Sequence, residues 1–306
     1  MSSNVLNRWG VIAVEGDDAV AFLQAQLSND VAGMPNQALR LAALCNAKGR
    51  MLGSFFVIRR AEGVLLITRS DALEALVKRL SMFVLRSKCK VRNACAEYSV
   101  HWVANSPVGK PMAVQQGQSG MLQASLRALP SGHLPGFELQ SANGEHGQAT
   151  GNGADDEFEH ALITLGLAFV CKANVEMFIP QAVNFDLVGG VSFSKGCYPG
   201  QEVVARSHYL GKLKRRAFLA HGQAAQSLEA GTDVWLEGKT NEPAGLVINS
   251  VQSGGRQHLL LELPVEDALE PGNKFFVQLD GQGPIALTLA LPPYDVQQKG
   301  NQFEVA

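Results

Sequence analysis

The chain has 306 residues, of which 46% are hydrophobic, with 26 lysines and arginines against 28 aspartates and glutamates and a formal net charge of −2. This length is enough for two or three domains, each with a large buried core. The near-neutral charge excludes a protein whose whole surface is built to hold nucleic acid.

The number and spacing of the cysteines indicate whether the protein resides in a reducing or an oxidising compartment. There are 5 of them, an odd number with no C-x-x-C pair, which is typical of free thiols in a reducing environment. Cys89 and Cys95 lack the second pair of ligands that a zinc site needs, so no metal site is predicted. The first residues do not resemble a signal peptide, and no run of about 18 apolar residues follows. We therefore expect a cytoplasmic protein with no membrane contact.

The first third of the chain predicts alternating strands and helices. Residues 11–14 are typical of a short strand, and Asp17 or Asp18 can cap the helix that follows. Residues 51–58 and 64–68 are rich in β-branched and aromatic side chains on either side of a turn, which predicts a hairpin. Apolar residues then recur at helical spacing, which predicts a helix that starts at Ser70 or Asp71 and packs on the core; these residues are Leu73, Leu76, Val77, Leu80, Phe83 and Val84.

The middle of the chain has a weaker pattern. Residues 100–103 predict another strand, whereas residues 106–120 show no clear period. Residues 141–156 are rich in Gly, Asn, Asp and His with few apolar residues, which predicts an exposed loop. A helix is expected to follow this loop over about residues 157–167.

The last third of the chain changes character after a basic run. Short β-rich segments separated by turns predict a small β-barrel; these segments are residues 218–220, 233–236, 244–248, 258–262 and 274–277. We therefore expect two portions, residues 1–212 with mixed α and β structure and residues 213–306 as a C-terminal β-barrel.

The densest chemistry of the chain lies in residues 193–206, which read F-S-K-G-C-Y-P-G-Q-E-V-V-A-R. Gly196 and Gly200 bracket Cys197, and Pro199 fixes a turn, so this thiol is predicted on a tight loop. The positive charge of Lys195, with that of Arg206, would favour the thiolate form of a nearby cysteine. The alternative is a glycine-rich turn with a buried structural cysteine, because free cysteine is among the most buried residue types.

This segment resembles a known signature. Residues 195–202, K-G-C-Y-P-G-Q-E, followed by Arg206, are similar to the pattern K-G-C-[FY]-x-G-Q-E-x-x-x-R of the YgfZ family. That family is a branch of the folate-binding superfamily that includes the glycine-cleavage T-protein, an aminomethyltransferase. Residues 16–31, 46–51 and 178–193 are similar to other segments of the family, in the same order along the chain.

The resemblance implies a fold and a cofactor. The fold is α+β and T-protein-like: two interleaved ferredoxin-like α+β lobes and a C-terminal β-barrel form a three-lobed ring around tetrahydrofolate or a derivative. Trp9 matches a tryptophan thought to bind folate, where an indole can stack on the pterin, with ordinary packing as the alternative. Phe158 stands where a second tryptophan is expected, and it keeps a stacking face without the N–H donor. Gln181 and Asn184, in the segment before the signature, are predicted folate contacts.

The resemblance also implies a task, which is to support iron–sulfur enzymes, including those that modify tRNA. Cys197 and Lys195 are the predicted reactive residues, with the thiolate contacting a cluster, a sulfur species or a folate-borne one-carbon unit. Gln201 and Glu202 are expected to orient the loop or bind the pterin edge, and Arg206 to hold negative charge on the folate. Because a stable cluster normally takes four thiolates, we expect transient contact only.

One departure separates this chain from the aminomethyltransferases. Those enzymes carry a pair of aspartates after the glycine turn, and Gly53 and Ser54 stand at these positions here. Loss of a general acid or base typically costs about 10²- to 10⁴-fold in rate. The chain is therefore not expected to act as an aminomethyltransferase, although a folate-dependent one-carbon transferase remains the alternative.

Direct tRNA binding is a further alternative. A short stretch carries several residues that can contact phosphates; these are Arg206, His208, Lys212, Lys214, Arg215 and Arg216, with Tyr209 available for stacking on bases. The same run can instead bind the glutamate tail of folate or face solvent, which the negative net charge of the chain favours.

Overall fold

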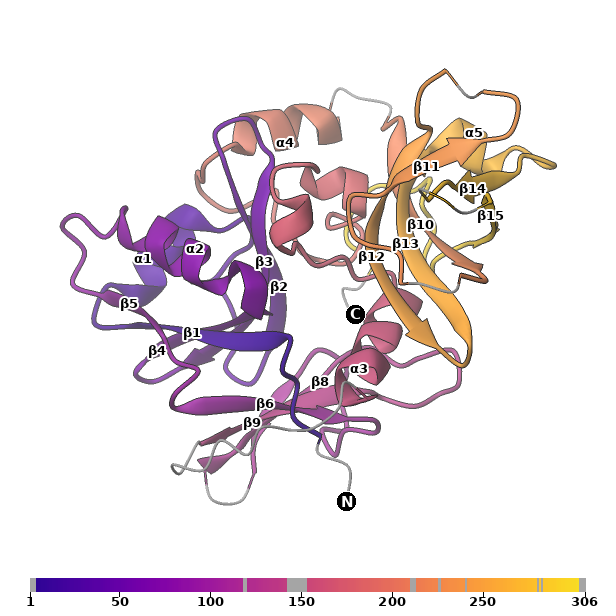
Figure 1. Ribbon diagram of the computed structural model, residues 1–306. Coiled ribbons are helices and arrows are strands. Elements are labelled where there is room, and N and C mark those ends of the chain that lie inside the picture. Colours follow the sequence, from indigo (N-terminus) through magenta and orange to yellow (C-terminus); the bar gives the residue numbers. More distant parts are fainter. Residues whose placement is uncertain are drawn as a thin grey trace.

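The computed structural model describes residues 4–117, 120–141, 153–209, 213–224, 227–239, 241–279, 281 and 283–302. Figure 1 shows three lobes, each built on its own sheet: the first at the left, the second below and the C-terminal lobe at the right. The predicted α+β class is confirmed, as is a closed C-terminal barrel. In the described part of the chain, no helix is both long and apolar enough to span a bilayer.

The first lobe is an antiparallel sheet with the strand order β2-β3-β4-β1-β5. Its strands are β1 (Trp9–Glu15), β2 (Leu39–Cys45), β3 (Met51–Arg60), β4 (Gly63–Arg69) and β5 (Lys90–Asn93). Helices α1 (Ala19–Gln26) and α2 (Ser70–Ser81) pack against one face, because alternate strand residues such as Ile12 and Val14 point to that side. The predicted strand at 11–14, the hairpin and the helix after residue 69 are all confirmed.

The second lobe is a four-stranded sheet with the order β6-β9-β8-β7. Its elements are β6 (Tyr98–Val103), β7 (Val114–Gln116), β8 (Leu122–Ser125), β9 (Gly136–Ser141) and helix α3 (Gly153–Thr164). The chain contacts this sheet before it enters β1, since the amide of Leu6 donates to Val100 O at 2.8 Å. Strand β7 lies in the stretch without a clear sequence period, and the loop predicted at 141–156 lies mostly outside the described residues.

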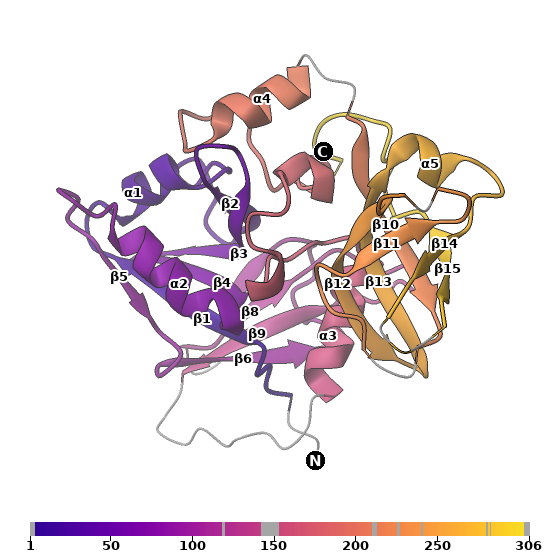
Figure 2. The same ribbon diagram turned by 45° about the horizontal axis from the view of Figure 1, so that its top comes forward.

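A connecting segment joins the lobes. It contains 3-10 turns at Lys172–Asn174 and Pro180–Val183, passes through Cys197, and ends in helix α4 (Gln201–Tyr209). Figure 2 shows α4 across the top of the molecule, between the first lobe and the barrel. The signature segment therefore lies where the parts of the fold converge.

The C-terminal lobe is a closed barrel with the order β10-β13-β12-β11-β14-β15. Its elements are β10 (Arg215–Gly222), β11 (Asp233–Leu236), β12 (Gly245–Ser253), β13 (Arg256–Pro264), α5 (Val265–Leu269), β14 (Phe275–Val277) and β15 (Ile285–Ala290). Each of the predicted barrel segments falls on a strand, and β15, which closes the barrel against β10, was not predicted.

A buried ion pair fastens the connecting segment to the barrel. Arg216 of β10 and Asp186 are 1% and 0% exposed, and the guanidinium donates to both carboxylate oxygens at 2.5 and 3.1 Å. Arg216 also donates to Gln181 O at 2.9 Å. The expectation that Arg216 belongs to an accessible basic run is therefore wrong, because its charge is used inside the protein.

The buried pair predicts a large loss of stability when one partner is removed. Asp186→Asn leaves the Arg216 charge buried without its counter-ion, so we expect the free energy of unfolding to fall by about 3–5 kcal/mol in urea titrations. The matched control is Asp267→Asn, whose partner Lys239 is exposed, with an expected loss below about 1 kcal/mol. Equal losses in the two variants would contradict the assignment.

Candidate functional site

Cys197 lies on the loop before α4, and it is exposed. The other cysteines are buried or half-buried, and burial raises the pKa of the Cys45 thiol to about 12. The predicted loop position is therefore confirmed, and the alternative of a buried structural Cys197 is wrong. Cys197 is the thiol of this chain that a partner can reach most directly.

Two sequence segments that are about 150 residues apart meet beneath this loop. Gly200 has φ +78°, and a Cβ there would lie 2.3 Å from Asn46 O and 2.7 Å from the Cα atom of Gly49. Gly49 has φ +72° and lies against Val203 of α4. Both positions need glycine because of backbone conformation and close approach. The turn at 46–51 and the signature thus form one unit that holds Cys197 in place.

Lys195 anchors the other side of the loop. Its Nζ donates to two carbonyl oxygens at the end of α1, those of Gln24 and, at 2.6 Å, Leu27. Burial lowers the pKa of Lys195 to about 8, although the charges of Asp30 and Cys197 act in the opposite direction. The charges of the thiol and of Asp30 therefore both act on Lys195, and its ammonium group titrates near pH 8.

The predicted ligands that follow the cysteine share helix α4. Gln201 is half-buried, while Glu202 and Arg206 are exposed. Within the described residues, the side chains of Glu202 and Arg206 make no hydrogen bond or ion pair. Their charged groups are thus available to a ligand or partner beside the thiol.

Trp9 and Phe158 lie together in the core below. Trp9 is 4% exposed, and its ring contacts that of Phe158 edge-on, with centroids 5.0 Å apart. The indole N–H donates to the buried carboxylate of Glu159 at 3.0 Å, which also pairs with Arg69. Burial raises the pKa of Glu159, while Arg69 and the Trp9 N–H oppose this shift. Trp9 is therefore packed in the core, which was the alternative to folate binding. Stacking of a pterin on the ring of Trp9 or Phe158 stays a prediction.

Gln181 and Asn184 are fully buried at the junction with the barrel. The Gln181 amide donates to Val204 O at 2.5 Å, so it holds α4 in place. The Asn184 amide donates to Ala217 O at 2.8 Å and to the Tyr294 hydroxyl at 3.2 Å, and its Oδ1 atom accepts from the Ala217 amide. Both side chains position neighbouring elements, and their direct contact with folate stays a prediction.

The positions expected to hold aspartates in a transferase lie inside the first sheet. A Cβ on Gly53 would come within 2.6 Å of Leu76, and Ser54 is fully buried. The Ser54 hydroxyl accepts from the amide of Val170 at 2.8 Å. These residues pack strand β3 and supply no carboxylate.

A cavity of about 810 Å³ lies where several parts of the fold meet. Its walls come from the first lobe, from the loop before β7, from the segment that leads into the signature, and from the C-terminal region; they include Asn29, Asp30, Leu39, Arg40, Leu41, Met112, Val188, Phe193, Ser194, Tyr209 and Asn301. Arg40 was not predicted as a site residue, because it lies on the edge strand β2 and its neighbours in the cavity are distant in the sequence. The cavity borders the thiol loop, because Phe193 and Ser194, which line it, directly precede Lys195.

The basic residues considered for tRNA binding differ in their exposure and in their partners. Arg216 is buried, and Arg215 pairs with Glu262 and donates to Ala244 O. Lys214 is exposed, and Lys212 lies outside the described residues. His208 stacks on Phe193 with ring centroids 3.7 Å apart. A continuous basic surface of these six residues is therefore not present.

The comparisons with known proteins agree with this architecture. No family model matches the chain. Among solved structures, the chain is similar to the glycine cleavage system aminomethyltransferase T from Bartonella henselae, with a TM-score of 0.70 and 19% identity over 97% of this chain and 86% of that chain. The similarity shows the shared fold, which confirms the predicted T-protein-like architecture. The narrower YgfZ assignment stays a prediction.

The exposure of Cys197 predicts a single fast thiol. With Ellman's reagent on the native protein, Cys197 should react first and the other cysteines more slowly or only after unfolding, because their sulfur atoms are covered. Cys197→Ser should lose the fast phase, and the control Cys89→Ser should keep it. Persistence of the fast phase in Cys197→Ser would show that another thiol is the accessible one.

The pKa of Lys195 predicts a titration between pH 7 and 9. One lysine Cε resonance in ¹³C NMR should titrate with a midpoint near pH 8 and be absent in Lys195→Arg. Because the unfolded chain keeps its proton to higher pH, this group should make the folded state relatively more stable as pH rises above 8. A Lys195 signal that titrates only near pH 10 would contradict the burial described here.

Proposed function

We propose that this protein binds folate in the cavity between its lobes and uses Cys197 to support iron–sulfur enzymes, including those that modify tRNA. The observation that carries the proposal is the position of the cavity beside the thiol loop: Ser194 lines the cavity and lies three residues before the exposed Cys197. The T-protein-like fold supports the choice of folate, since proteins of that superfamily bind it, and the K-G-C-Y-P-G-Q-E segment supports the choice of task.

The cavity fits a folate in size and chemistry. Its volume of about 810 Å³ lies within the range that holds drug-sized ligands. The pKa of Asp30 is lowered, mainly by the hydrogen bond that its carboxylate accepts from the Gly33 amide. Asp30 therefore offers a carboxylate to the amino group of a pterin. Arg40 offers a guanidinium to a glutamate carboxylate, and Leu39, Leu41 and Met112 supply apolar walls. Bound folate would supply a one-carbon carrier beside the loop.

The protein's own residues then have separate tasks. Lys195 in its ammonium form places a positive charge beside the loop that carries Cys197, and in its neutral form it can accept a proton there. Glu202 and Arg206 present charges of opposite sign on α4 to a docking partner. One thiolate without further ligands suits transient contact with a partner's cluster or sulfur, not permanent possession of a cluster.

Aminomethyl transfer is less well supported. The positions of the expected aspartates hold Gly53 and Ser54, and both are buried in the sheet. We therefore expect no turnover of tetrahydrofolate with an amine donor.

Calorimetric titration with tetrahydrofolate tests the binding step. The wild type should bind, and Arg40→Gln should bind about 10- to 100-fold more weakly through loss of a charge-assisted hydrogen bond. Arg59→Gln is the matched control, because Arg59 donates to the carbonyl of Ala32 near the cavity but does not line it. The affinity of this variant for tetrahydrofolate should be unchanged. No binding by the wild type, or equal losses in both variants, would refute folate binding in this cavity.

The thiol step is tested separately with Cys197→Ser. This variant should bind tetrahydrofolate as tightly as the wild type but fail to restore iron–sulfur enzyme activity in a strain that lacks the protein, because serine cannot replace a thiolate. Full complementation by Cys197→Ser would show that the loop has a structural role only.

A further inference from the structure

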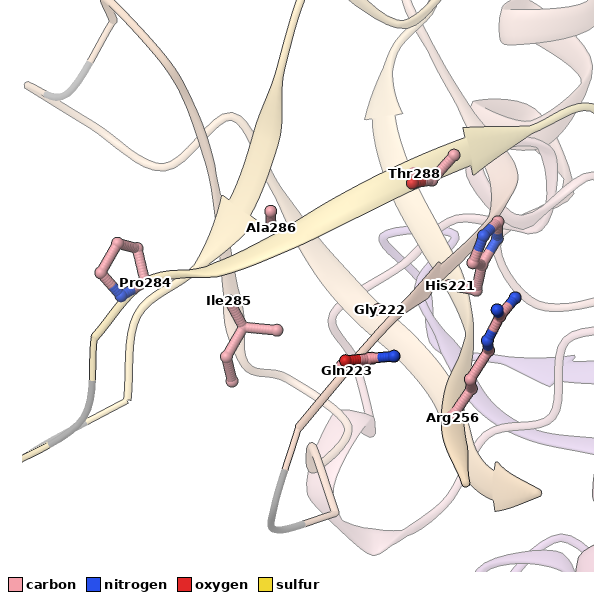
Figure 3. A pocket seen from close by; sticks show the side chains of 8 residues that line it. All are labelled: His221, Gly222, Gln223, Arg256, Pro284, Ile285, Ala286 and Thr288. Carbon is pink, nitrogen blue, oxygen red and sulfur yellow. The ribbon is translucent and has the colours of Figure 1, made fainter. Parts of the chain in front are cut away.

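A second pocket lies on the outer surface of the barrel, where β10, β13 and β15 run side by side. Its volume is about 420 Å³. Figure 3 shows the side chains that line it, which are those of His221, Gln223, Arg256, Pro284, Ile285, Ala286 and Thr288, together with Gly222. It shares no lining residue with the cavity between the lobes.

Strand register brings the polar groups of this pocket together. His221 of β10 is directly opposite His258 of β13 and Thr288 of β15. Because side chains alternate between faces, Arg256 shares the outer face with His258 two residues later. In Figure 3 the Arg256 side chain extends toward the His221 ring, with Gln223 and Thr288 nearby. Neighbouring strands thus place these polar side chains on the same outer face of the barrel.

Arg256 brings a positive charge to this pocket. None of the described residues that line it carries a carboxylate. Burial lowers the pKa of His258, and the charged neighbours that act on it are His160, His221 and Arg256, all of which lower it further. His160 of α3 lies in ring contact with His258, with centroids 4.3 Å apart. A guanidinium that faces a pocket without a lining carboxylate favours an anionic ligand, because the Coulomb attraction is then not offset by a negative side chain.

The donors of the pocket are also free. Within the described residues, the side chains of His221, Gln223, Arg256 and Thr288 make no hydrogen bond or ion pair. They comprise a guanidinium, an imidazole, an amide and a hydroxyl group, which are the groups that bind the several oxygens of a tetrahedral oxyanion.

We propose that this pocket binds a phosphate group, either inorganic phosphate or the phosphate of a small monoester. The Arg256 guanidinium pairs with two phosphate oxygens, while His221, Gln223 and Thr288 donate to the remaining acceptors. The site is independent of the folate and thiol chemistry proposed above, because it lies on the barrel surface and uses none of the same residues.

The test is a titration of the full chain at pH 7, with inorganic phosphate and glycerol 3-phosphate as the probes and the histidine ring signals followed by NMR. The His221 and His258 signals should shift and saturate, while that of His133, on the second lobe, should not. Arg256→Gln should weaken binding about 10- to 100-fold, as expected for loss of a charge-assisted hydrogen bond. Arg256 is exposed, so this variant should fold.

Lys274→Gln is the matched control, because it removes one exposed positive charge from the same barrel outside the pocket. Its affinity should be unchanged. Equal affinities for the two probes would assign the site to free phosphate, and tighter binding of the ester would assign it to a phosphorylated metabolite. Absence of saturable shifts, equal weakening in Lys274→Gln, or shifts produced by tRNA alone would overturn the proposal.

Discussion

The ion pair between Asp186 and Arg216 is the interaction on which the central part of this fold depends. It lies between the connecting segment and the first strand of the barrel, with both side chains almost completely buried. Asn184 and Gln181 hydrogen-bond in the same region, to β10 and to α4. These bonds fix the position of the connecting segment relative to β10 and α4, and thereby the position of the loop that carries Cys197.

The site is then assembled by close backbone packing. Gly49 and Gly200 allow the turn at 46–51 to lie directly against the start of α4. A Cβ on Gly200 would collide with the backbone of this turn, and a Cβ on Gly49 would crowd the side chain of Val203. Lys195 fixes the opposite side of the loop through the carbonyl groups at the end of α1. The thiol is therefore exposed on a rigid support, which is the arrangement expected for a group that must meet a partner and keep its orientation.

Local sequence patterns predicted much of the fold, and long-range contacts explain what they missed. The hairpin of β3 and β4 and the helix after residue 69 could be predicted because their periodicity is local. Strand β7 could not, because three residues carry too little pattern. The glycines and the proline of the signature predicted a tight loop, whereas the exposure of Cys197 was left open. The burial of Arg216 and Trp9 depends on partners far away in the sequence, Asp186 and Glu159. Arg40 could be connected with a cavity only after the lobes were placed together.

The proposed function requires folate to bind in the cavity between the lobes, next to the loop that carries Cys197. A crystal structure of the protein grown with tetrahydrofolate tests it most directly. We expect ligand density in the cavity lined by Asp30 and Arg40, with the pterin or its one-carbon position on the side of Lys195 and Cys197. Density for folate at a different place, or an unchanged cavity at saturating tetrahydrofolate, would contradict it.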